Sequence, residues 1–142
     1  MRPWQSFSNW LRLWTAPKSL GRRGEDAAAR FLRRLGYVIV ARGQRDKIGE
    51  IDLIAVDGRT VVFIEVKTRT AELKGTPAEA VDHDKQKRLT KLALAYMKRH
   101  DLLECKARFD VVAVTWPDKS RRPQIEHIKD AFESVGMDGF FS

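Results

Sequence analysis

Residues 49–67 read GEIDLIAVDGRTVVFIEVK, in which two runs rich in aliphatic and β-branched residues flank the dipeptide Asp57-Gly58. Asp-Gly between such runs is a strong signal for a two-residue hairpin turn. We therefore expect antiparallel strands at residues 50–56 and 60–67, with Val56 opposite Arg59. This hairpin would form the centre of a sheet.

The expected register gathers four charged side chains on one face of the hairpin. Residues two apart on a strand, and residues opposed across it, project from the same side of a sheet. Glu50 then opposes Glu65, and Asp52 is a diagonal neighbour of Glu65, with Lys67 beside them. The other face is apolar and is expected to pack on the core: Ile51, Leu53, Ala55, Val62, Ile64 and Val66. A three-residue turn would instead shift the register and separate the carboxylates.

This combination suits metal-dependent hydrolysis of a phosphodiester. Carboxylates held close together repel one another unless a proton or a cation lies between them. Hard oxygen ligands such as Asp52 and Glu65 favour Mg²⁺ or Mn²⁺, which lowers the pKa of a bound water. Lys67 would orient that water or stabilise the developing charge. The competing interpretation is a salt-bridged hairpin edge, which is ordinary for Glu-x-Lys alone.

Helical and strand patterns flank the hairpin along the chain. Residues 21–35 carry apolar side chains at helical spacing, the last of them Leu35, and Gly36 is placed to end that helix. Further expected elements are a strand at 37–41, a loop at 43–48, a helical region from Thr76 to about His100 with an interruption near 82–84, and a strand at 109–115; residues 125–132 are ambiguous. The order α-β-β-β-α-β predicts an α/β domain with a mixed sheet.

The chain has 142 residues, enough for one domain, which we place at residues 21–132 with a tail at 133–142. Residues 1–20 form a basic, aromatic leader. Four of its apolar side chains share one face of a short helix: Phe7, Trp10, Leu11 and Trp14. That face would pack on the domain or on a partner subunit, and contact with a membrane or with unpaired bases is the weaker alternative.

Composition favours a cytoplasmic protein with no stable membrane insertion. No apolar run approaches the roughly 20 residues needed to span a bilayer. The first residues lack the pattern of a secretory signal. The single cysteine, Cys105, excludes an internal disulfide framework and a thiolate zinc site.

The net charge of +8 is unevenly distributed, because residues 1–45 carry ten basic side chains and two acidic ones. Nine of the ten are arginines, whose planar fork suits bidentate contact with phosphate. A second basic cluster lies within residues 85–99. We expect a nucleic acid partner, most simply DNA, although a solvated basic surface is the alternative. Candidate nucleic-acid-binding residues are Arg22, Arg23, Arg30, Arg33, Arg34, Lys85, Lys87 and Arg88.

Four motifs occur in a familiar order: GRRGE at 21–25, GEIDLI at 49–54, FIEVK at 63–67 and RFDVV at 108–112. Together they resemble the bacterial YraN-like family, which is similar to Holliday junction resolvases of the PD-(D/E)XK nuclease superfamily. The resemblance covers about residues 20–132. It implies a restriction-endonuclease-like fold, in which helices flank a central mixed sheet.

The resemblance also implies roles for single residues. Asp52, Glu65 and Lys67 fall on the catalytic positions of the superfamily. Glu25 matches an acid of the first helix, so the implied metal ligands are Asp52, Glu65 and Glu25. Lys85 matches a helical lysine that would meet the scissile backbone.

Two acids have other expected roles. Glu50 either supports the metal ligands from behind or pairs with a nearby arginine. Asp110 is expected to be a structural partner of a basic side chain rather than a ligand.

Two functions from different classes follow. The first is a Mg²⁺- or Mn²⁺-dependent endonuclease that cleaves DNA, branched or otherwise structured, as a homodimer if its substrate is two-fold symmetric. The second is a module or adaptor that holds DNA or RNA and cleaves nothing. The acid–lysine set favours the first, because binding alone needs no acids that face phosphates.

Overall fold

The computed structural model describes residues 19–70, 81–117 and 122–135 of the chain. Its elements in chain order are α2 (Leu20–Arg34), β1 (Val38–Asp46), β2 (Gly49–Asp57), β3 (Thr60–Thr70), α3 (His83–Arg99), β4 (Lys106–Trp116) and β5 (Gln124–Phe132). The expected leader helix and Thr76 lie outside the described residues.

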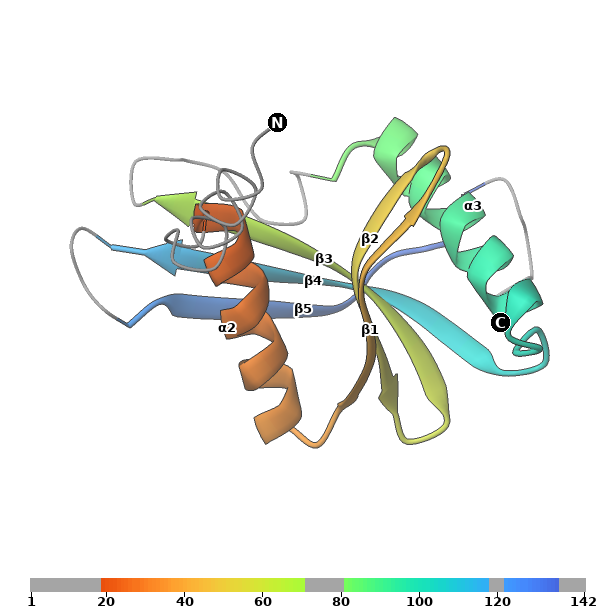
Figure 1. Cartoon of the computed structure of the whole chain (residues 1–142), viewed down its shortest axis with the longest axis horizontal. Coiled ribbons are helices and arrows are strands. Elements are labelled where there is room, and N and C mark those ends of the chain that lie inside the picture. The colour runs from red at the N-terminus through yellow and green to blue at the C-terminus, as the bar shows by residue number, and fades with distance from the viewer. Residues whose placement is uncertain (1–18, 71–80, 118–121, 136–142) are drawn as a thin grey trace, which may run out of the picture.

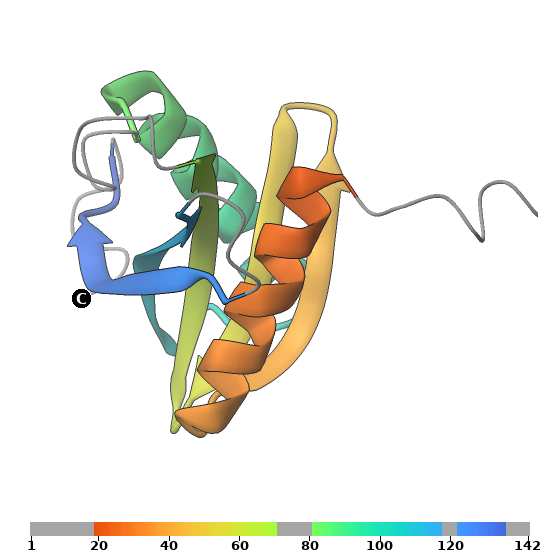
Figure 2. The same ribbon diagram turned by 90° about the vertical axis from the view of Figure 1, so that its left-hand side faces the viewer.

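The five strands form one sheet in the order β1-β2-β3-β4-β5. The strands β3 and β4 are parallel, and every other neighbouring pair is antiparallel. Helix α2 lies on one face of the sheet and α3 on the other (Figures 1 and 2). The mixed α/β fold is thus confirmed, and its arrangement, with one further strand, is compatible with a restriction-endonuclease-like fold.

Helix α2 forms largely as its sequence predicts. The Ser19 side chain caps it by accepting a hydrogen bond from the Arg22 backbone N–H at 3.3 Å. Gly36 follows the helix with φ of +96°, the left-handed conformation that favours glycine after a helix. Leu35, expected on the buried stripe, is 55% exposed, because it is the C-cap residue where the helix leaves the sheet.

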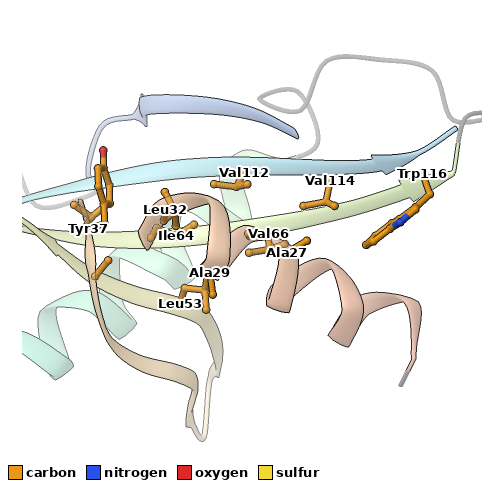
Figure 3. Packing of buried hydrophobic residues seen from close by; sticks show 13 residues of the cluster. Ala27, Ala29, Leu32, Tyr37, Leu53, Ile64, Val66, Val112, Val114 and Trp116 are labelled. Atoms are coloured by element: carbon orange, nitrogen blue, oxygen red, sulfur yellow. The ribbon is translucent and has the colours of Figure 1, made fainter. Parts of the chain in front are cut away.

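Both faces of the sheet are buried, which divides the core into two layers. The α2 layer packs alanines of the helix on residues such as Leu53, Ile64 and Val112 (Figure 3). The α3 layer contains Ile54 and Phe63, which point the opposite way because strand residues alternate. Ile51, expected beside Leu53, is instead in the α3 layer, since β2 has stopped pairing with β3 before it.

The register of the β2–β3 hairpin differs from the expectation by two residues. Asp57 pairs with Thr60, so the turn residues are Gly58 and Arg59 rather than Asp57 and Gly58. Gly58 has φ of +62°, and Arg59 is not among the described residues with positive φ. This matches the class of two-residue turns that places glycine first. Because the shift is even, the paired residues keep their predicted faces, and the same register continued past its last pair, Leu53 and Ile64, would bring Asp52 opposite Glu65 rather than diagonal to it.

Other boundaries also differ from expectation. The expected loop at 43–48 is mostly strand, because β1 continues to Asp46 as an exposed edge that pairs with β2. Helix α3 begins after Asp82, whose carboxylate accepts a hydrogen bond from the Lys85 backbone at 2.8 Å. The expected interruption near 82–84 is therefore a helix start. The ambiguous residues 125–132 belong to β5, which pairs with the edge of β4.

Candidate metal and nuclease site

The candidate site lies where β2 and β3 separate. The paired register ends at Leu53 and Ile64, and beyond it the two strands point in different directions (Figure 1). The Asp52 carboxylate spans the opening by accepting a hydrogen bond from the Val66 backbone N–H at 2.8 Å. A side chain thus replaces the next backbone contact, and this fixes the position of Asp52.

Three carboxylates meet at this opening. One oxygen from each of Glu25, Glu50 and Asp52 lies within 4.8 Å of the other two. Glu25 comes from the first turns of α2, and the preceding Gly24 explains its approach. A Cβ at Gly24 would lie 1.8 Å from Thr68 Oγ1, so only glycine allows the helix to pack this closely on β3.

Glu65 lies beside this cluster and is paired with two lysines. Its side chain is only 6% exposed. Lys67 Nζ lies 3.5 Å from Glu65 Oε1, and Lys85 of α3 forms an ion pair with the same oxygen. The structure therefore brings together all four predicted catalytic residues, together with Glu50 and Lys85.

Glu50 pairs with an arginine, which is one of its two expected roles, and it also lies among the candidate metal ligands themselves. It is part of the three-carboxylate group, and its Oε2 also accepts hydrogen bonds from Arg45 at 2.8 and 3.2 Å. In the three-carboxylate group Glu50 takes the place of Glu65, which the resemblance implies as a ligand. The register of β1 with β2, which pairs Arg45 with Glu50, shows why both roles are open to one side chain.

The crowding of acids shifts their proton equilibria. Burial, and then the neighbouring Glu65 carboxylate, raise the pKa of Asp52 to about 7. Burial and the nearby Glu50 carboxylate also raise the pKa of Glu25. These acids resist ionisation when no cation is present, so the site favours binding of a proton or a positive ion.

The two lysines are shifted in opposite directions. Burial lowers the pKa of Lys67, and the neighbouring Lys85 adds to this effect. Burial also acts against the charge of Lys85, but its hydrogen bond to Glu65 and the charges of Glu65 and Asp52 together outweigh burial and raise its pKa. Lys67 is thus the ammonium group more easily converted into a proton acceptor.

A cleft of about 350 Å³ opens onto these groups. Glu50, Asp52 and Glu65 form its acidic wall, and Lys85 and Arg88 line the side formed by α3. Ile48, at the tip of the β1–β2 hairpin, and Leu89 and Leu92 of α3 complete it. The sequence does not assign these three residues to the site, because Ile48 is distant in the chain from Leu89 and Leu92 and all three are ordinary apolar residues.

The donor set fits a divalent cation. It offers only carboxylate oxygens, the ligands that Mg²⁺ and Mn²⁺ prefer, and three of them already lie within 4.8 Å of one another. The raised pKa values of Asp52 and Glu25 indicate a negative field that a cation would relieve. Glu25, Glu50 and Asp52 are the residues able to hold it, with Glu65 adjacent.

The remaining predicted basic residues occupy two faces of the molecule. Lys87 and Arg88 are exposed on α3, near the cleft. Arg22, Arg23 and Arg33 are exposed on α2, and the Arg23 guanidinium lies over the Trp116 ring at 4.8 Å from its centroid. The other two, Arg30 and Arg34, line a different cleft.

Asp110 is a structural partner of basic side chains, as predicted. It is fully buried and accepts hydrogen bonds from Arg108 Nε at 3.0 Å and from the Asp130 backbone at 3.0 Å. Its other oxygen lies 2.8 Å from His127 Nε2. These contacts lie between β4 and β5, and none of them includes the acids of the cleft.

The fold and the site define a class: a mixed α/β protein, compatible in arrangement with a restriction-endonuclease-like fold, with an acid–lysine cluster at a strand opening. Residues 24–114 match the model of the uncharacterised protein family UPF0102. The chain belongs to this family.

Members of the family from several bacteria are similar over most of the chain. A UPF0102 protein of Rhodopirellula baltica is 51% identical over 125 residues, covering 86% of this chain and 75% of its own. UPF0102 proteins of Geotalea uraniireducens and Geobacter sulfurreducens are each 50% identical, covering 82% of this chain and 91% and 90% of theirs. The YraN-like membership expected from the motifs is thereby confirmed.

Neither helix in the described part of the chain is both long enough and apolar enough to cross a bilayer.

Proposed function

We propose that this protein is a divalent-metal-dependent endonuclease that hydrolyses phosphodiester bonds of DNA, with branched DNA among its substrates. One observation carries the proposal. Glu25, Glu50 and Asp52 converge beside the Glu65–Lys67 pair. The cleft next to them is lined by Glu50, Asp52 and Glu65 and also by Lys85 and Arg88. A surface that only held phosphates would gain nothing from carboxylates in this position, because they repel the backbone.

In the proposed hydrolysis the carboxylates and Lys67 have different roles. Glu25, Glu50 and Asp52 would hold Mg²⁺ or Mn²⁺, which when bound neutralises phosphate charge and lowers the pKa of a coordinated water. Glu65 fixes Lys67 Nζ at 3.5 Å, at the edge of the cluster. The lowered pKa of Lys67 suits it to take a proton from the attacking water or to stabilise the charge that develops on the phosphate.

The surroundings of the cleft suit a polyanion. Lys87 and Arg88 of α3 and the exposed arginines of α2 would contact the backbone without reading sequence. Cleavage of a two-fold symmetric junction would require a homodimer. The expected cytoplasmic location, where DNA is accessible, belongs to the same proposal.

Cleavage assays with the full chain test the proposal directly. Labelled junction, flap and linear DNA are incubated with Mg²⁺, Mn²⁺ or EDTA, and products are resolved on denaturing gels. We expect metal-dependent cleavage that Asp52→Asn and Lys67→Met each reduce by about 100-fold or more. Two control variants carry the same charge changes at exposed positions far from the cleft, Glu104→Gln and Lys106→Met, and they should cleave normally.

A binding module without nuclease activity is the second candidate. It is favoured by the pairing of Glu65 with two lysines, which neutralises that acid without any metal. DNA binding that is equal in Mg²⁺ and in EDTA, with no product from any substrate, would establish this alternative and reject the nuclease. Cleavage that persists undiminished in Asp52→Asn would also reject the assigned site.

A further inference from the structure

A second cleft, rich in arginine, lies on the side of α2 away from the acids. It has a volume of about 420 Å³ and is lined by Arg30, Arg34 and Arg122 over an apolar floor. The floor consists of Ala27, Phe31, Pro123 and Ile125. In Figure 2 the first residues of β5 lie beside the middle of α2, where these residues meet.

The sequence of α2 explains why these side chains share one cleft. Ala27, Arg30, Phe31 and Arg34 are spaced at i, i+3, i+4 and i+7, which places them on one stripe of a helix. Opposite them, Ile125 of β5 packs on the α2 layer of the core. The floor is therefore fixed by the core, and the arginines rise from its rim.

The charges of Arg30 and Arg34 are not balanced by any acid among the described residues of this cleft. No carboxylate is among the described residues that line it. Arg30 and Arg34 are exposed and form no ion pair with any other described residue. Asp26, one turn before Arg30, is engaged by Arg42. The guanidinium groups of Arg30 and Arg34 beside an apolar floor suit a ligand that combines phosphate with a flat apolar group.

Exposed arginines connect this cleft with the acidic site. At about 100° per residue, Glu25 projects from the side of α2 opposite Ala27 and Arg34. The exposed arc between these two sides carries Arg22, Arg23 and Arg33. A phosphate backbone can therefore follow positive charge around the outside of the helix, from the arginine cleft to the side that carries Glu25.

The width of the helix decides which nucleic acid can follow this path. A helix with its side chains is about 10–12 Å across, so the path turns sharply over a short distance. Duplex DNA resists bending on this scale, since its persistence length is about 150 bp. A single strand bends freely and exposes bases that can stack on aromatic side chains such as Phe31.

We propose that the arginine cleft binds a nucleotide of a single-stranded segment, so that the substrate carries an unpaired strand next to the site of cleavage. This inference rests on the proposed nuclease function for the identity of the nearby acidic site. The binding itself requires no metal and no cleavage. It can therefore be tested even if the nuclease proposal fails.

Fluorescence anisotropy of the full chain with labelled (dT)20 in EDTA measures this binding. The test variant is Arg30→Ala/Arg34→Ala, and the control is Arg59→Ala/Lys98→Ala, which removes the same charge from exposed positions elsewhere. We expect the test variant to weaken (dT)20 binding about tenfold or more and to reduce the slope of log K against log[salt] by about 1.4. The control should lose less than about threefold. Thermal unfolding of each variant verifies that it is folded.

Two further binding measurements distinguish a single strand from the other possible ligands, a DNA duplex and a free nucleotide. On a 20-bp duplex, the test and control variants should lose affinity equally. Free dTMP should bind far more weakly than (dT)20. Equal loss of (dT)20 affinity in the two variants would overturn the proposal, and so would dTMP binding as tight as that of the oligonucleotide, which would make the cleft a site for free nucleotides.

Discussion

Asp52 affects the stability of the fold in two opposing ways. Its carboxylate holds the β2–β3 opening through the Val66 N–H, yet burial and Glu65 raise its pKa to about 7. A raised pKa means that the folded state prefers the protonated acid. The stability that this proton supports is present below the ordinary pKa of an aspartate and is lost as the pH rises through about 7.

Asp52→Asn should therefore stabilise the metal-free protein above pH 7. The amide remains neutral, and its oxygen can still accept the Val66 hydrogen bond. In EDTA at pH 8.5 we expect a gain of about 0.5–2 kcal/mol in the free energy of unfolding, with a smaller gain at pH 5. Thermal unfolding at the two pH values measures it. A loss of stability at pH 8.5, or a gain independent of pH, would contradict the role given to Asp52.

Lys85 is expected to matter more for stability than an exposed lysine of the same helix. Glu65 is nearly buried, and Lys85→Met leaves it with Lys67 as its ion-pair partner in the cleft. We expect a loss of about 1–3 kcal/mol, because a buried carboxylate loses a charged hydrogen bond. Lys87→Met, on the exposed side of α3, should change stability by less than about 0.5 kcal/mol. Equal effects in urea unfolding would show that the Lys85 pair is only a surface contact.

At the scale of elements, the position of α2 depends on one close contact. Gly24→Ala would place a methyl group 1.8 Å from Thr68 Oγ1, so the helix must move away from β3. We expect a loss of about 1–3 kcal/mol and displacement of Glu25 from the other acids. Gly21→Ala has open space and should be neutral or slightly stabilising. Chemical denaturation of Gly24→Ala, of Thr68→Ala and of the double variant measures the coupling, which should be absent if the contact is unimportant. Gly21→Ala is measured beside them as the control.

The elements themselves were largely predictable, but their register and ends were not. The apolar stripe of α2 and the Asp57-Gly58 turn depend on neighbours in the chain, which a sequence displays directly. Whether Gly58 is the first or the second turn residue depends on backbone dihedral angles, and both placements keep the same faces. The strand at 43–46 was missed because its polar residues are held by pairing with β2 at an exposed edge.

The sequence predicts which residues form the candidate site, but it does not predict how they are arranged in space. Because side chains alternate along β2 and β3, a register shift of two residues leaves Asp52, Glu65 and Lys67 on the same face. The convergence of Glu25 and Glu50 on Asp52 depends on the close packing at Gly24 and on the divergence of the strands. Contacts of this kind join distant parts of the chain, and no local pattern encodes them.

At the scale of the whole molecule, Arg108 and Asp110 connect elements that the two apolar layers leave separate. Arg108 of β4 donates hydrogen bonds to Asp57 at the β2–β3 turn at 3.0 Å and to Tyr37 after α2 at 2.6 Å. Asp110 links the same arginine to β5 through His127. One buried ion pair thus holds four segments at the end of the sheet away from the acids.

Asp110→Asn should destabilise the fold without changing the chemistry of the cleft. Although burial opposes ionisation, the hydrogen bonds from His127 and Arg108 keep the pKa of Asp110 below its ordinary value. Its contribution to stability is therefore present above the pKa of an unfolded aspartate and is lost as the pH falls through the lowered value. At pH 7 we expect a loss of about 3–5 kcal/mol, because the amide leaves Arg108 without its buried charge partner. The control is Glu126→Gln, at an exposed position of β5, which should change stability by less than about 0.5 kcal/mol. Equal urea midpoints for the two variants would exclude Asp110 as the link between β4 and β5.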